Sequence, residues 1–211
     1  MNNYELMLKF KYFIRPFLMM LRYFKWVLRR RPIRELCPFS KRTIIFDNAK
    51  LFNCTTFIET GTYCGDTVAA MRGAFKTIMS VELYEPLYKM NKIRFKNCSD
   101  VYLWLGDSSI ALHDMVSKIE GRALFWLDGH YSGPGTGKTE TECPIIAELN
   151  VISGHSRNDH CILIDDARCF GQVKDYPPMA FINSKLISIN PNYNISINKW
   201  GKGVNCLRYT L

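Results

Sequence analysis

The sequence predicts an α/β protein built on a mostly parallel β-sheet with helices on both faces. From residue 56 to residue 165, short apolar runs rich in β-branched and aromatic residues alternate with longer segments of helical character. Each run ends in an acid or is followed at once by turn residues and an acid. Strand and helix alternating at this interval indicate right-handed βαβ crossovers, which lay successive strands parallel.

Five strands and four helices are expected in this region. The predicted strands are Thr56–Glu59, Thr77–Glu82, Val101–Leu105, Leu124–Asp128 and Cys161–Asp165. The predicted helices are Asp66–Phe75, Pro86–Phe95, Ser108–Ile119 and Glu140–Ser153. The tail differs in kind, with a helix at Pro178–Ile189 and an antiparallel hairpin of Tyr193–Asn198 and Val204–Thr210. The sheet is thus expected to have seven strands.

Positive charge is concentrated at the N-terminus. Residues 1–35 hold nine Lys/Arg and two Glu, so they carry seven of the nine net positive charges. The remaining chain is close to neutral and gives no reason to expect a nucleic-acid groove. The eight cysteines are scattered without a C-x-x-C pair, which favours free thiols in a reducing cytosol.

The segment 4–31 is apolar but interrupted by charge every few positions, so it has no run long enough to span a bilayer. On a helix, five of its basic residues share one face: Lys11, Arg15, Arg22, Lys25 and Arg29. This pattern predicts an amphipathic arm on the cytoplasmic face of an anionic membrane. The alternative is packing on the domain or on a second subunit. We therefore expect an arm at 1–35, a connector at 36–54 with one short strand or helix (Thr43–Phe46), and a domain at 55–211.

A glycine turn follows the first predicted strand, in the stretch F-I-E-T-G-T-Y-C-G-D-T from residue 57 to residue 67. Gly61 and Gly65 allow positive φ and close approach of the backbone to a ligand. Asp66 or Thr67 is expected to cap the next helix. The pattern predicts a ligand at this turn, and an ordinary strand-to-helix turn is the alternative.

Acids recur where the strands end. In a parallel sheet the carboxyl ends of the strands share one edge, where ligands bind. Glu82 is placed to accept the two hydroxyls of a ribose, and Asp107 with Ser108 to meet an adenine edge. The full set of strand-end residues is Glu59, Glu82, Asp107, Asp128, Asp165 and Asp166.

In order, E-T-G-T-Y-C-G-D-T, V-E-L and L-G-D-S resemble the motifs of the class I S-adenosylmethionine-dependent methyltransferases, which have a Rossmann-like fold. The terminal hairpin is similar to that family's reversed last strand. The resemblance covers residues 55–211. It implies S-adenosylmethionine as cofactor, held by Glu59, Thr60, Gly61, Tyr63, Gly65, Thr67, Glu82, Asp107 and Ser108.

Two further stretches, F-W-L-D-G-H-Y-S-G and I-L-I-D-D-A-R, resemble the metal-dependent O-methyltransferases of the catechol and macrolide-sugar types. By position, this resemblance implies that Asp128, Asp165 and Asp166 bind Mg²⁺, with Mn²⁺ or Ca²⁺ also suited to such hard oxygen ligands. The alternative is that these acids only cap helices. W-L-D-G-H-Y-S-G is also similar to methyltransferases of bacterial surface-polysaccharide loci, which implies a glycan or glycolipid sugar as acceptor.

His130, two residues after Asp128, is the candidate general base, with Asp128 beside it. Lys138 and Arg168 are candidates for contact with the acceptor, and pairing with Asp165 or Asp166 is the alternative for Arg168. The other histidines, His113, His155 and His160, are expected on helix or loop surfaces with no such role.

The stretch 132–139, S-G-P-G-T-G-K-T, resembles the phosphate loop of an NTPase. The complete pattern needs glycine where Ser132 stands, and the loop does not spring directly from its strand. We interpret it as a lid over the acceptor. Two alternatives stay open: an NTPase that uses this loop, and a binding protein that keeps the fold without turnover.

Overall fold

The structure is a computed structural model that describes residues 39–129, 143–200 and 204–210. The predicted arm at 1–35 and the glycine-rich loop at 132–139 lie outside these ranges, as do His130 and Lys138. No helix in the described ranges is long and apolar enough to cross a bilayer. The six cysteines whose side chains are described are all free thiols, as expected.

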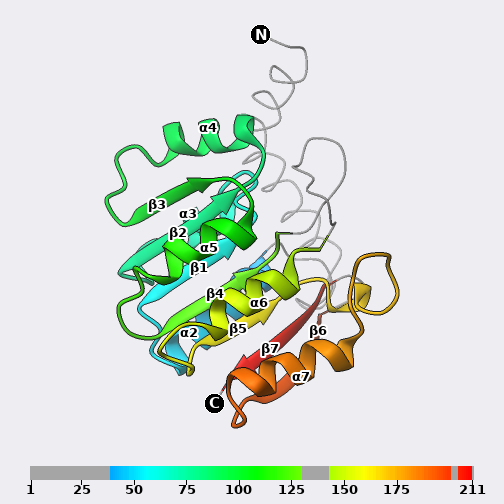
Figure 1. The fold of residues 1–211 in the computed structure, drawn as a ribbon. Coiled ribbons are helices and arrows are strands. Elements are labelled where there is room, and N and C mark those ends of the chain that lie inside the picture. Colours follow the sequence, from blue (N-terminus) through cyan, green and yellow to red (C-terminus); the bar gives the residue numbers. More distant parts are fainter. Residues whose placement is uncertain (1–38, 130–142, 201–203, 211) are drawn as a thin grey trace, which may run out of the picture.

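A seven-stranded sheet forms the centre of the fold, and its strands are the labelled arrows in Figure 1. Its strands are β1 (Thr56–Thr60), β2 (Thr77–Glu82), β3 (Val101–Leu105), β4 (Ala123–Leu127), β5 (Cys161–Ile164), β6 (Asn194–Trp200) and β7 (Val204–Thr210). Their order is β3-β2-β1-β4-β5-β7-β6. The first five are parallel, and β7 is antiparallel to both β5 and β6. The predicted α/β class with a parallel core is confirmed.

Helices cover both faces of the sheet (Figure 1). They are α2 (Phe39–Leu51), α3 (Asp66–Met71), α4 (Glu85–Arg94), α5 (Ser108–Val116), α6 (Ile145–Ser153) and α7 (Met179–Ile189), with a short 3₁₀ turn at Ala167–Cys169. Side chains of α5, α6 and α7 pack into one core layer, and those of α2 and α3 into the other.

Strand β4 shows why its sequence is apolar throughout. Ala123, Phe125 and Leu127 point into the layer with α5, α6 and α7, while Leu124 and Trp126 point into the layer with α2 and α3. Successive side chains of a strand alternate between faces, and both faces here are covered, so every position is buried.

Helix α2 is the main departure from the sequence prediction, which placed only a connector with one short element here. It has thirteen residues and packs against α3, β4 and β5. Its residues Ile44 and Ile45 are buried, and the Asn48 side chain donates back to the Ile44 carbonyl at 2.7 Å. This segment is therefore part of the core.

Helix α3 is shorter than predicted and is capped differently. Neither Asp66 nor Thr67 is the cap, because Gly65 occupies that position in the left-handed region and Asp66 is the first helical residue. The helix ends at Met71 because Arg72 is extended and Gly73 has a φ of +83°.

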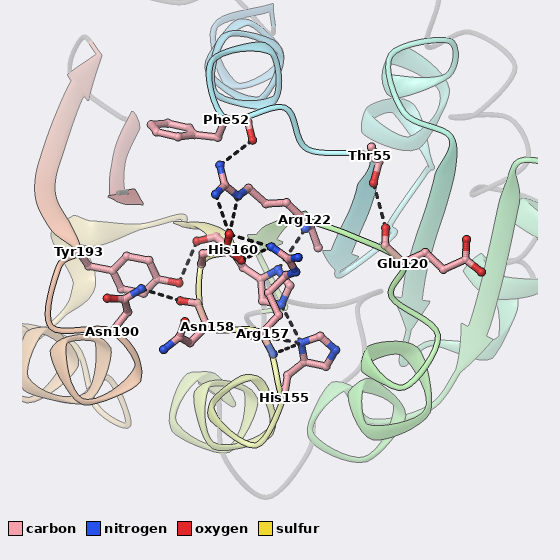
Figure 2. Close-up of polar contacts among 12 residues, drawn as sticks. Phe52, Thr55, Glu120, Arg122, His155, Arg157, Asn158, His160, Asn190 and Tyr193 are labelled. Carbon is pink, nitrogen blue, oxygen red and sulfur yellow. Dashed lines mark hydrogen bonds and ion pairs between the residues drawn. The ribbon is translucent and has the colours of Figure 1, made fainter.

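A polar cluster lies where β4 and β5 begin, at the amino ends of the parallel strands (Figure 2). It includes His160, which was expected on the surface. The ring is buried; its Nδ1 accepts from the Ala123 backbone N–H at 3.1 Å, so its Nε2 donates to His155 Nδ1 at 2.9 Å. The Tyr193 hydroxyl donates to the His160 carbonyl at 2.8 Å. Burial lowers the pKa of His160 to about 4, which keeps the ring neutral. His160 thus joins β4, β5 and the segment before β6.

Candidate active site

The glycine turn runs from β1 into α3 and is tied to β2. The N–H groups of Gly61 and Thr62 both donate to the Val81 carbonyl, at 3.0 and 3.1 Å. The Gly65 N–H donates to the Thr62 carbonyl at 2.8 Å, and Tyr63 takes a positive φ of 48°. The turn therefore has a defined conformation beside the carboxyl end of β2.

Neighbouring protein atoms leave no room for a side chain at Gly61 or Gly65. A Cβ on Gly61 would lie 2.6 Å from the Asp128 carbonyl oxygen, and one on Gly65 would lie 2.3 Å from Asn91 Oδ1. Both residues also have positive φ, near +86° and +71°. Gly61 thus lets the turn approach the end of β4, and Gly65 lets it pack on α4.

Glu82, the last residue of β2, fastens the turn from the other side. Its Oε2 accepts from the Tyr63 N–H at 2.7 Å, and its Oε1 from the Tyr84 N–H at 2.9 Å. Burial raises the pKa of this carboxyl, and its bonds from backbone N–H groups partly offset the rise. Glu82 therefore holds the first and second strand-end turns together at the edge of the sheet.

Glu59 and Thr60 lie beneath the turn and are buried. Glu59 Oε2 accepts from Ser80 Oγ at 2.9 Å, and Thr67 also donates to its carboxylate. Burial raises the pKa of Glu59 to about 8. Thr60 Oγ1 accepts from the Asp128 N–H at 3.2 Å. These residues join β1 to α3, β2 and the end of β4.

At the end of β3, Asp107 is the N-cap of α5, with Oδ1 accepting from the N–H and the hydroxyl of Ser109 at 2.8 and 2.7 Å. Ser108 is largely buried and donates to Glu148 of α6. Thr60 also donates to Glu148, and burial raises the pKa of this carboxyl to about 7.

At the ends of β4 and β5, Asp128 and Asp165 share one cation, the ammonium of Lys41 from α2. Lys41 Nζ lies 3.3 Å from Asp128 Oδ2 and forms a closer ion pair with Asp165 Oδ2. It also stands 5.7 Å from the ring centre of Trp126, within range of a cation–π contact. Burial by itself lowers the pKa of Lys41, but attraction to Asp128 and Asp165 outweighs it and raises this pKa above its usual value. Burial and then the charge of Asp165 raise the pKa of Asp128.

These contacts do not fit the predicted three-acid metal site. A divalent ion of the predicted kind needs several oxygen ligands at about 2.0–2.6 Å. In this structure the ammonium of Lys41 lies between two of the acids, and Asp166 Oδ1 pairs with Arg168 at 2.9 Å. Within the described ranges no group of three acidic, His or Cys side chains is arranged to bind a metal. In this structure the three carboxylates are thus paired with Lys41 and Arg168, an arrangement that differs from the predicted ligand set.

The structure brings together most of the predicted edge residues and adds two that the sequence prediction missed. Lys41 comes from a segment predicted as a connector, and nothing in its local sequence marks it. Glu148 has a signal, because it is the single charged residue in the mostly apolar helix I-I-A-E-L-N-V-I-S. Arg168 pairs with Asp166, which is one of the two roles that the sequence suggested for it.

No protein-family model and no curated protein matches the sequence. Solved structures match the fold. A methyltransferase from Podospora anserina bound to SAH is 15% identical, with 92% of this chain and 88% of that one covered and a TM-score of 0.56. The O-methyltransferase from Bacillus cereus in complex with SAH is 13% identical, with 92% and 90% covered and a TM-score of 0.57. The spermidine synthase from Thermotoga maritima is 10% identical, with 82% and 60% covered and a TM-score of 0.52.

The chain thus has the α/β Rossmann-like fold of methyltransferases. Identities this low establish the fold and not the reaction, and a spermidine synthase is among the matching structures. The activity therefore has to be argued from the site itself.

Proposed function

We propose that this protein transfers the methyl group of S-adenosylmethionine to a hydroxyl of its acceptor. The observation that carries the proposal is the junction of the glycine turn with Glu82, through the bond from the Tyr63 N–H at 2.7 Å. In α/β nucleotide sites an acid at the end of the second strand holds the ribose, next to the turn after the first strand. A carboxylate has about four acceptor positions, so Glu82 can accept a hydroxyl beside its backbone donors.

The reaction needs a base near the acceptor. The hydroxyl oxygen attacks the sulfonium methyl group, the carbon–sulfur bond breaks, and the hydroxyl proton passes to a base. We propose His130 for this role, with Asp128 beside it, because Asp128 follows β4 where the glycine turn meets the strand ends and His130 is two residues further along the chain. Metal assistance is not part of the proposal, since Lys41 stands between the acids that the resemblance assigned to the metal.

For the acceptor we propose a sugar hydroxyl of a glycan or glycolipid. The sequence resemblance around residues 126–133 supports this class of substrate. The basic arm supports a membrane-bound acceptor, because seven net positive charges in residues 1–35 favour an anionic bilayer surface. Co-sedimentation of the full chain with anionic and with neutral liposomes tests the arm. A defined dimer that ignores both liposomes would instead favour the arm as a subunit contact.

The NTPase alternative is less well supported. A phosphate loop follows its strand directly, whereas β4 ends at Leu127, several residues before Ser132. The turn that does leave its strand directly is the one after β1. A fold kept only for binding would leave the acids after β4 and β5 without a chemical role.

Isothermal titration of the full chain with S-adenosylmethionine, with SAH and with ATP tests the proposal. We expect binding of the first two and none of ATP. Glu82→Gln should weaken SAH binding about 10- to 100-fold, because hydrogen bonds to a charged group are worth about 1.5–3 kcal/mol. Glu85→Gln is the matched control, since Glu85 is an exposed acid three residues later that pairs with Lys89. Preference for ATP, or equal SAH affinity in both variants, would contradict the proposal.

A further inference from the structure

The acid pair Asp128 and Asp165 already has a cation from the protein itself. Lys41 Nζ contacts Oδ2 of both carboxylates, and these lie at the ends of the neighbouring strands β4 and β5. A single positive group therefore bridges the two strand ends, which is the position that a divalent ion would take between the same two side chains.

The backbone and its neighbours fix this arrangement. Lys41 lies in the first turn of α2, and the next turn of that helix is anchored in the core by Ile44 and Ile45, neither more than 4% exposed. The side chain passes over Trp126, whose ring supports the ammonium from one side. The cation is thus delivered by a packed helix and not by an exposed loop.

Asp166, the third acid of the predicted metal site, is paired with Arg168. Asp166 has a left-handed backbone with a φ of 52°, and its carboxylate pairs with Arg168 at 2.9 Å. A metal at the pair would have to displace Lys41 and draw Asp166 away from Arg168. One atom favours an additional partner, because Asp165 Oδ1 is buried without a hydrogen-bond partner among the described residues.

We propose that Lys41 takes the place of a divalent cation at this edge, so that the acceptor site of this protein works without a metal. The inference concerns the acceptor half of the proposed methyltransferase site and rests on that function. Lys41 offsets one of the two negative charges of the acid pair and contacts both Oδ2 atoms. Lys41 is a positioning residue in this scheme.

A Mn²⁺ titration of the full chain followed by electron paramagnetic resonance tests the proposal. Wild type should bind no Mn²⁺ at the pair. Lys41→Met should bind one Mn²⁺ at least about 100-fold more tightly, because a like charge a few ångströms from the ion is removed. Lys41→Arg, which keeps the charge, and Lys50→Met, on the exposed last turn of the same helix, should resemble wild type. The double variant Lys41→Met with Asp165→Asn should lose the new site.

Two results would overturn the inference: Mn²⁺ binding by wild type that Asp165→Asn removes, or no gain of binding in a folded Lys41→Met. If Lys41→Met does not fold, the comparison of wild type with Asp165→Asn still decides. Titration with SAH on the same preparations keeps the two proposals apart, since loss of SAH binding refutes the methyl-donor site and leaves the Mn²⁺ result valid for the acid pair.

Discussion

Replacing Gly61 by alanine is the sharpest test of how the glycine turn meets the acid edge. The new Cβ would lie 2.6 Å from the Asp128 carbonyl oxygen, which belongs to the backbone and cannot rotate away. Gly73→Ala is the matched control. Its φ of +83° is close to the +86° of Gly61, yet a Cβ on Gly73 would meet no atom within 4 Å.

The two variants separate backbone strain from overlap. A left-handed alanine costs about 1–2 kcal/mol, and this applies to both. Gly61→Ala adds overpacking of about 1–3 kcal/mol, so its free energy of unfolding should fall by about 2–5 kcal/mol in all. Because the overlap displaces Asp128 and the turn, SAH affinity should fall in Gly61→Ala and stay unchanged in Gly73→Ala.

Urea denaturation followed by circular dichroism gives the first quantity, and titration calorimetry with SAH the second. Equal losses of stability in the two variants would refute the close approach of the turn to β4. Equal SAH affinities would show that the turn is not coupled to the donor site.

Two further predictions use the pH dependence of stability. Burial raises the pKa of Glu148 to about 7, so the folded state binds this proton more readily and loses stability as pH rises through that value. In urea denaturation, the free energy of unfolding of Glu148→Gln should be higher than that of wild type by up to about 3 kcal/mol at pH 8 and equal to it near pH 4. A variant that is less stable than wild type at both pH values would show that the charged form is well accommodated. The pKa of His160 is lowered to about 4, so on acidification the unfolded chain binds the proton before the folded protein does. The free energy of unfolding of wild type should therefore fall by up to about 3 kcal/mol between pH 6.5 and pH 4. His160→Asn keeps an acceptor for the Ala123 N–H without a titrating ring, and a loss as steep in this variant would assign the effect to other groups.

Strand positions were predictable because both faces of the sheet are covered. Runs such as L-F-W-L have few interpretations other than a buried strand. The bounds of β2, β3 and β7 agree with the prediction, and the other strands differ by one or two residues at one or both ends. Helix α2 was missed because its buried face contains Asn48, so the helical period of apolar residues is broken. The adjacent Ile44 and Ile45 look equally like part of a strand.

The site residues that follow the strands could be predicted from the sequence, whereas their partner Lys41, which comes from a helix, could not. The parallel sheet itself brings Glu82, Asp128 and Asp165 to one edge, so their residue types and positions were enough. The partner of an acid pair comes from tertiary packing, and Lys41 is 87 residues before Asp128 and 124 before Asp165. No local pattern encodes a contact of that separation.

The reversed strand β7 has a consequence for the order in which the chain folds during synthesis. It lies between β5 and β6, although both precede it in sequence. Until residues 204–210 leave the ribosome, the outer edge of β5 has no partner, and an unpaired edge is prone to pairing with other chains. Asp165 directly follows β5, so its surroundings become complete only with the last strand. A nascent chain stalled before residue 204 would thus have the glycine turn in place, but β5, which Asp165 follows, would still lack its pairing with β7.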